Sequence, residues 1–193
     1  MNTPSEEEHR RKAIAWATTL TRNTPLEPQA YERRLLELYA RGELTLERVV
    51  VLLDEQVHHI LYCSEVVQAL REDQLTDLLE QSHRYNEQHQ ITGLLCYSGG
   101  HFVQLLEGPK EAVYALYARI RQDTRHRHVV ALRDGAGPTR WFADWRMALV
   151  EPTPREMYWI ITHLQTRQYN LVSPRLPITD PRLLTLLGAF SQL

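Results

Sequence analysis

Between residues 57 and 150, apolar positions follow in turn the short period of strands and the longer period of amphipathic helices. Gly99-Gly100 lies between two apolar runs and predicts a tight hairpin. The resulting order, β-α-β-β-α-β with a fifth strand added, is that of a ferredoxin-like α+β sheet carrying two helices on one face. The expected strands cover residues 57–64, 91–98, 101–108, 128–134 and 145–150, and the expected helices cover 72–89 and 109–124.

Both flanking regions have the apolar spacing of helices. In the first region, Ser5 before three glutamates and Thr45 before an apolar run are expected to be helix N-caps. We therefore expect a helical N-terminal extension (1–56), a core domain (57–150) and a C-terminal helical extension (151–193). The C-terminal helices are expected to cover the second face of the sheet, because an uncovered apolar face would promote association.

Composition excludes several classes of protein. The 193 residues are 43% hydrophobic with a formal net charge of -2, so no excess of positive charge favours nucleic acid. No apolar run approaches the ~20 residues of a membrane span. Cys63 and Cys96 lie in strand-like runs, Glu107 reads as a turn residue or the partner of a nearby arginine, and the histidines lack the pattern of a metal site. We expect a cytoplasmic protein with no metal, nucleic-acid or membrane partner.

Five side chains of the core domain offer unusual chemistry: a phenol, two amides, an indole and a thioether, from Tyr62, Asn86, Gln104, Trp145 and Met147. Gln104 is the least ordinary, because a lone interior amide costs about 1–3 kcal/mol unless it is paired. Taken singly, Tyr62 fits a core tyrosine, Asn86 fits a helix cap, and Trp145 and Met147 fit core packing. Together they contain no hydrolytic triad and suit an aromatic, hydrogen-bonding cofactor.

In their order, and with the surrounding I-T-G-L-L, L-L-E-G and W-x-M, these residues resemble the BLUF domain, a blue-light photoreceptor module that uses FAD. The resemblance implies that Tyr62 donates an electron and a proton to excited FAD. It also implies that Gln104 relays the proton and then rotates or tautomerises, which shifts the flavin spectrum slightly to the red. Trp145 and Met147 would pass the change to the protein surface, and which of them lies beside the glutamine stays open.

The same resemblance implies a set of FAD contacts. Asn86 would meet the pyrimidine edge of the ring, and Ser82 would lie near the flavin. Arg125 and His126, in D-T-R-H, would contact the polar edge and the ribityl-phosphate tail. Tyr85 departs from the family pattern, in which another polar residue is common before the asparagine. The residues themselves do not distinguish FAD from FMN.

Residues 1–56 resemble the small helical antitoxins that inhibit Fic AMP-transferases, through R-G-E-L and the order of their helices. The glutamate of the inhibitory motif is missing from T-L-T-R-N-T. A helical extension that packs on the core domain or forms a dimer is therefore the simpler interpretation.

The predicted function is blue-light sensing through bound FAD, in a photoreceptor that is not an enzyme and has no catalytic output domain. Signalling would then act through a homo-oligomer or through a downstream protein partner that the sequence does not identify. Two alternatives stay open. One is a flavin-dependent oxidoreductase, and the other is a flavin-free protein-interaction module.

Overall fold

The computed structural model describes residues 4–24, 26–166 and 178–191. Its contacts divide the chain into two compact units. The first consists of residues 1–57 with 135–139, and the second of residues 58–134 with 140–193.

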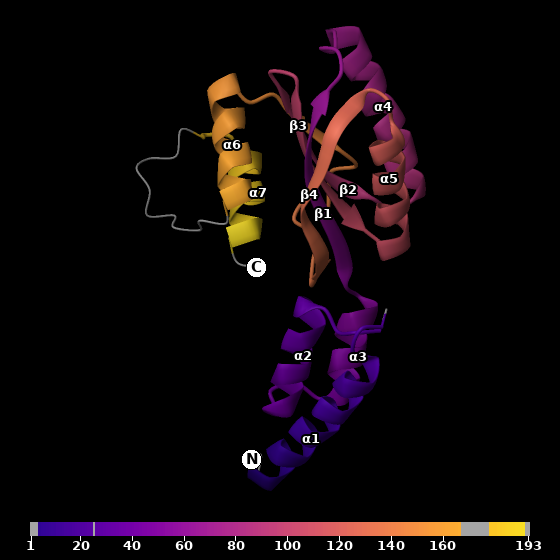
Figure 1. Cartoon of the computed structure of the whole chain (residues 1–193), viewed down its shortest axis with the longest axis vertical. Coiled ribbons are helices and arrows are strands. Elements are labelled where there is room, and N and C mark those ends of the chain that lie inside the picture. Colours follow the sequence, from indigo (N-terminus) through magenta and orange to yellow (C-terminus); the bar gives the residue numbers. More distant parts are fainter. Residues whose placement is uncertain (1–3, 25, 167–177, 192–193) are drawn as a thin grey trace. The chain divides into compact units, whose positions relative to one another are not determined.

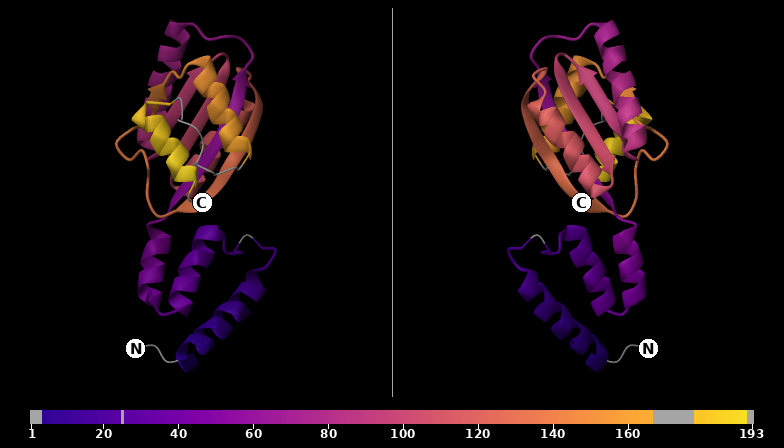
Figure 2. Two further views of the ribbon diagram at one scale, coloured as in Figure 1. Left: turned by 90° about the vertical axis from the view of Figure 1, so that its left-hand side faces the viewer. Right: turned by 90° about the vertical axis from the view of Figure 1, so that its right-hand side faces the viewer.

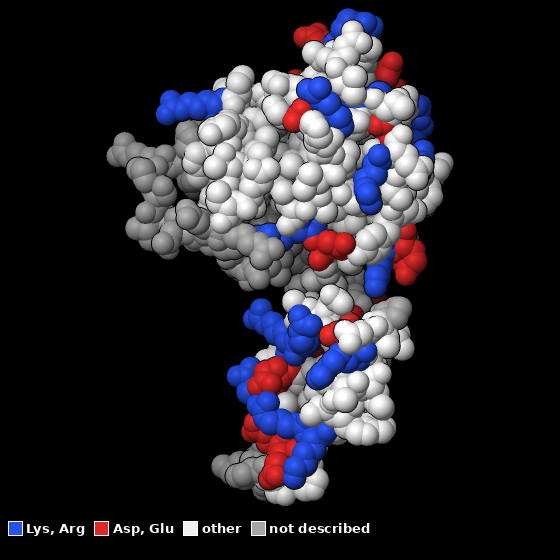
Figure 3. Space-filling model, in the orientation of Figure 1, with Lys and Arg blue, Asp and Glu red and all other residues white. Residues whose placement is uncertain are grey.

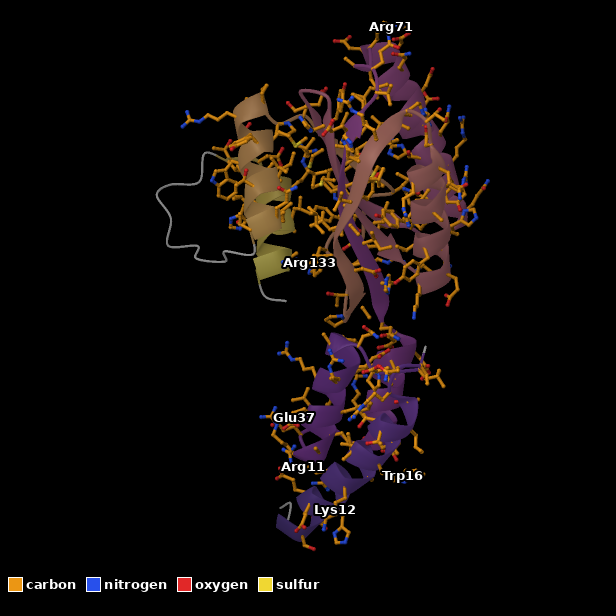
Figure 4. All side chains as sticks on the ribbon, viewed as in Figure 1. Arg11, Lys12, Trp16, Glu37, Arg71 and Arg133 are labelled. Carbon is orange, nitrogen blue, oxygen red and sulfur yellow. The ribbon has the colours of Figure 1, made fainter. Side chains whose placement is uncertain are left out.

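The first unit is built from helices α1 (Pro4–Thr21), α2 (Ala30–Ala40) and α3 (Leu46–Asp54). Thr45 caps α3 as expected, since its Oγ1 accepts a hydrogen bond from Arg48 N at 3.2 Å. Ser5 is not a cap, because α1 already begins at Pro4, a residue suited to the first turn of a helix. Arg11 and Glu37 form a two-pronged ion pair at 2.8 and 2.9 Å that joins α1 to α2 (Figure 4).

The second unit contains a five-stranded sheet in the order β4-β1-β3-β2-β5 (Figure 1). Strand β3 pairs antiparallel with both β1 and β2, and β5 pairs parallel with β2. Gly99 and Gly100 join β2 to β3 with φ of 56° and 78°, the left-handed values that a two-residue hairpin requires. The ferredoxin-like order and the fifth strand are confirmed. The strands are β1 (Val57–Val66), β2 (Thr92–Ser98), β3 (His101–Gly108), β4 (His126–Gly137) and β5 (Ala148–Val150).

Helices cover both faces of this sheet. Helices α4 (Glu72–Gln88) and α5 (Lys110–Gln122) lie on one face, and α6 (Pro154–Thr166) and α7 (Pro181–Ser191) lie on the other (Figure 2). Alternation along β3 divides its side chains between two cores, with Val103 and Leu105 facing α6 and α7. Phe102 and Leu106 face α4 and α5. The expected position of the C-terminal helices is therefore confirmed for the described residues.

The final strand is shorter than expected. Strand β5 begins at Ala148, so Trp145 and Met147 lie in the segment before it rather than within it. The carbonyl groups of residues 145–147 bond outside the ladder: they accept from Gly93 N at 3.1 Å, Asn86 Nδ2 at 2.6 Å and His83 Nε2 at 2.8 Å, in chain order. Because these contacts replace ladder pairing, the strand starts only after Met147.

Candidate cofactor site

Tyr62 and Gln104 lie directly opposite each other on the neighbouring strands β1 and β3. Both side chains point to the face covered by α4 and α5, where Tyr62 is 1% and Gln104 7% exposed. The Tyr62 hydroxyl donates a hydrogen bond to Gln104 Oε1. The other end of the amide, Nε2, donates to Met147 Sδ at 3.3 Å. The three side chains therefore form one hydrogen-bonded row with a defined amide orientation.

The phenol in this row is held neutral. Burial raises the pKa of Tyr62 well above its usual value of 10.0, and the nearby Tyr117 and Asp123 raise it further. An isolated buried hydroxyl would lack a partner for its proton, but Gln104 Oε1 accepts it. Among the described residues, Gln104 Oε1 is therefore the acceptor toward which the Tyr62 proton points.

A cavity of about 360 Å³ opens beside this row, between the sheet and helices α4 and α5. Its walls combine apolar side chains with a limited number of polar groups, as small-molecule sites do. The predicted site residues that line it are Tyr62, Ser82, Asn86, Gln104, Arg125 and His126. The structure thus brings together residues from strands β1, β3 and β4, from helix α4, and from the turn before β4.

Asn86 is completely buried near the C-terminal end of α4. Its Nδ2 donates to the Arg146 carbonyl at 2.6 Å, while its Oδ1 has no hydrogen-bond partner among the described residues. A buried acceptor left unpaired costs about 1–3 kcal/mol. Because Asn86 lines the cavity, an occupant that offers an N–H donor would remove this cost.

Ser82 and Tyr85 also line the cavity. Ser82 Oγ donates to the Leu78 carbonyl of its own helix at 2.8 Å. Tyr85, the residue that departs from the family pattern, lies beneath the Arg119 guanidinium, 4.5 Å from its ring centre. The hydroxyl of Ser82 is therefore satisfied by the backbone, and Tyr85 contributes its ring to the wall.

Charged and titratable side chains also line the cavity. Arg125 is paired with Asp123 at 2.6 Å, which fixes its guanidinium and lowers the pKa of the carboxyl. His126 Nδ1 lies 3.0 Å from Ser64 Oγ. Burial lowers the pKa of His126, an effect that Asp123 opposes and Arg125 reinforces. Asp123 was not predicted as a site residue, although it is the aspartate of the D-T-R-H sequence.

Met147 and Trp145 occupy different environments. Met147 is 3% exposed and contacts Gln104, whereas Trp145 is 44% exposed with Arg182 5.7 Å from its ring centre. Met147 is therefore the residue beside the glutamine in this structure. Trp145, predicted as a partner in the switch, lies at the surface. Neither Trp145 nor Met147 is among the residues that line the cavity.

A buried carboxylate holds the segment that leads to Met147. Glu107, at the end of β3, is fully buried and accepts hydrogen bonds from Trp141 N at 2.7 Å and Phe142 N at 3.0 Å. Arg140 donates to the Glu107 carbonyl oxygen at 2.9 Å. From the sequence, Glu107 was expected to be a turn residue or the partner of a nearby arginine. The hydrogen bonds of its carboxylate reach a segment far along the chain, so no local sequence pattern predicts them.

The described part of the chain contains no group of three or more histidine, cysteine, aspartate or glutamate side chains arranged to hold a metal ion. It also contains no helix long and apolar enough to cross a membrane. Basic and acidic side chains are intermixed on the face of the N-terminal helices seen in Figure 3.

Residues 57–148 match the family described as sensors of blue-light using FAD, so this part of the chain is a BLUF domain. FAD is the cofactor that defines the family.

Similar proteins agree with this assignment. The beta subunit of photoactivated adenylate cyclase from Euglena gracilis is 38% identical over 93 residues, which are 46% of this chain and 11% of that protein. The blue light- and temperature-regulated antirepressor BluF from Escherichia coli (strain K12) is 38% identical over 86 residues, 42% of this chain and 21% of that protein. The chain thus spans only a small part of the length of these relatives.

Among solved structures, the dark state of BlrB, a BLUF protein, is 25% identical with a TM-score of 0.51. The match covers 72% of this chain and 97% of BlrB. A bacterial light-regulated adenylyl cyclase is 29% identical with a TM-score of 0.50, over 57% of this chain and 33% of that one.

The residues present fit a flavin. The unpaired Oδ1 of Asn86 is an acceptor for a ring N–H, and the Gln104 amide offers both a donor and an acceptor at the edge of the cavity. The cation of Arg125 in the cavity lining suits a phosphate-bearing tail.

Proposed function

We propose that this BLUF domain senses blue light through a switch formed by Tyr62, Gln104 and Met147. The observation that carries the proposal is the hydrogen-bonded row from the Tyr62 hydroxyl through the Gln104 amide to Met147 Sδ, beside a cavity that contains an unpaired acceptor. When bound, FAD supplies the absorption of blue light and, once excited, an electron acceptor.

The chain's own part begins with the Tyr62 proton. Its only partner in the described structure is Gln104 Oε1, so a phenol that loses an electron passes its proton to that oxygen. The amide then rotates or tautomerises, since a protonated Oε1 no longer accepts from the phenol. Burial of both side chains excludes water from this transfer.

Rotation of the amide changes what Met147 meets. In the described orientation, Nε2 donates to the thioether, which is a weak acceptor and carries no proton. Once the electron and the proton have returned to Tyr62, the rotated amide is neutral again, Oε1 faces Sδ, and neither atom can donate. The contact between Gln104 and Met147 is then lost, so Met147 is released from its dark position.

The segment before β5, which contains Met147, passes the movement of Met147 on to the rest of the domain. Its carbonyl groups at Arg146 and Met147 are held by Asn86 and His83 of α4. In this proposal the recipient of the signal is a partner protein or a second copy of the chain. Arg125, His126 and Ser82 act as cofactor-binding residues, and Trp145 acts downstream of Met147 rather than in the hydrogen-bonded row.

Tyr62→Phe tests the proposal. The variant keeps the ring and so should keep the flavin, but it removes the proton and the red-shifted state with it. Tyr117→Phe is the matched control, because Tyr117 lies 5.5 Å from Tyr62, centre to centre, and forms no part of the row. A normal light response in Tyr62→Phe would contradict the proposed switch.

A further inference from the structure

Arg182, in the first turn of α7, contacts the nearby Asp180 and two residues that are distant in the sequence, Leu149 and Trp145. Its guanidinium forms a two-pronged pair with Asp180, through Nη2 at 2.6 Å and Nε at 3.1 Å. Its remaining nitrogen, Nη1, donates to the Leu149 carbonyl at 3.1 Å. The Trp145 ring lies 5.7 Å from the guanidinium carbon, within the range of a cation–π contact.

Two of these partners bracket the switch residue. Trp145 precedes Met147 by two positions, and Leu149 follows it by two. Arg182 therefore contacts the chain on both sides of Met147. Leu149 lies in β5, whose other neighbour in the described sheet is β2. A shift of the chain at Met147 would therefore act on the two Arg182 contacts that flank it.

The guanidinium is anchored firmly on the side of α7. Leu183, Leu186 and Leu187 are at most 2% exposed and pack in the core shared with α6 and the sheet. Asp180 fixes the plane of the guanidinium, which leaves its third nitrogen and its flat face directed at β5 and Trp145. Arg182 thus connects the edge of the sheet to a helix in the opposite layer.

We propose that Arg182 is a positioning residue that couples Met147 to α7, so that light loosens the start of this helix through the loss of its contacts with Trp145 and the Leu149 carbonyl. This inference rests on the proposed function, because it takes the movement of Met147 as its input. It assigns the output of the switch to one side chain and one helix end.

The test is amide hydrogen exchange of α7 in the full flavin-bound chain, in the dark and under continuous blue light. In the wild-type protein, light should speed exchange in the first turns of α7 by at least about threefold, the factor that corresponds to losing the exposed cation–π contact alone. Arg182→Met should exchange equally in the dark and in the light while it keeps the red shift of the flavin spectrum.

Two further variants sharpen the test. Arg182→Lys keeps a positive charge beside Asp180, which protects folding, but it lacks the planar fork needed to hold Asp180, Leu149 and Trp145 together. It should also lose most of the light dependence in α7. Arg155→Met, at an exposed position of α6, is the matched control and should behave as the wild type does.

The outcomes separate the two proposals. A wild-type chain with no spectral shift overturns the proposed switch, and the coupling falls with it. A wild-type chain that shifts its spectrum without any light effect on α7 overturns the role of Arg182 alone. So does a full light effect on α7 in both Arg182→Met and Arg182→Lys.

Discussion

Gln104 Nε2 lies 3.3 Å from Met147 Sδ, so the amide donates to a group that cannot donate in return. The partner at the other end, the Tyr62 hydroxyl, is both a donor and an acceptor and tolerates either orientation of the amide. The amide therefore has one preferred orientation in the described structure, and Met147 determines which one it is.

Gln104→Leu should retain flavin and lose the red-shifted state. The leucine fills a similar volume in the buried row but offers no group to accept the Tyr62 proton. Absorption spectra before and after blue light measure the effect, with Gln165→Leu on the opposite face of the sheet as the control. A red shift of normal size in Gln104→Leu would show that the amide is not the element that switches.

The hydrogen bond between Tyr62 and Gln104 predicts that substitutions at these two positions have non-additive effects on the free energy of unfolding. Gln104→Leu leaves the buried Tyr62 hydroxyl without its partner, a loss of about 1–3 kcal/mol in the free energy of unfolding. Adding Tyr62→Phe removes the orphaned hydroxyl and should recover much of that loss. Urea unfolding of the flavin-free chain gives this free energy for the wild type, the two single variants and the double variant. Strict additivity would mean that the two side chains are not coupled.

Asn86→Leu should weaken flavin binding by about tenfold, which is roughly one net hydrogen bond. Asn86 lines the cavity and its Oδ1 has no partner among the described residues, so the variant removes an acceptor that a ring N–H would use. Titration of the flavin-free chain with FAD gives the dissociation constant, and Gln88→Leu, exposed on the same helix, is the control. Equal affinities for the two variants would show that Asn86 does not contact the flavin.

Glu107→Ala should lower the free energy of unfolding by about 3 kcal/mol, because it leaves the backbone N–H groups of Trp141 and Phe142 without their acceptor. Glu111→Ala, at an exposed position of α5, should change it by less than about 0.5 kcal/mol. Urea unfolding at neutral pH compares them. Similar values for the two variants would mean that the carboxylate does not hold this segment.

His126 predicts a dependence of stability on pH. Its pKa is lowered in the folded state, chiefly by burial, so the unfolded chain binds the proton more readily. The stability linked to His126 is therefore complete above the usual pKa of 6.5 and is lost as the pH falls below it. His126→Gln should reduce the fall in melting temperature between pH 7 and pH 5.5. An unchanged fall would show that His126 titrates alike in both states.

The sheet order and the inward direction of two strand residues could be predicted from the sequence, because both follow from local regularities. Alternation along the strands sets the inward direction of Tyr62 and Gln104, and Gly99-Gly100 fixes the hairpin that aligns β2 with β3. Neither requires knowledge of distant contacts. The ordered set of motifs then singled out one family.

The segment before β5 could not be predicted in the same way. Its conformation depends on Glu107, Asn86 and His83, which approach it only after the sheet and α4 have formed. The pattern W-R-M-A-L-V equally fits a longer strand with Trp145 and Met147 on one face. The inward methionine and the outward tryptophan therefore follow from tertiary contacts rather than from local pattern.

The most direct test is the absorption spectrum of the purified, flavin-bound chain before blue light, after it, and during recovery in the dark. The proposed switch predicts a main flavin band that moves slightly to the red and returns in darkness, since only the hydrogen bonds around an oxidised flavin change. A band that bleaches under light, or one that does not respond at all, would contradict a switch built on Tyr62, Gln104 and Met147.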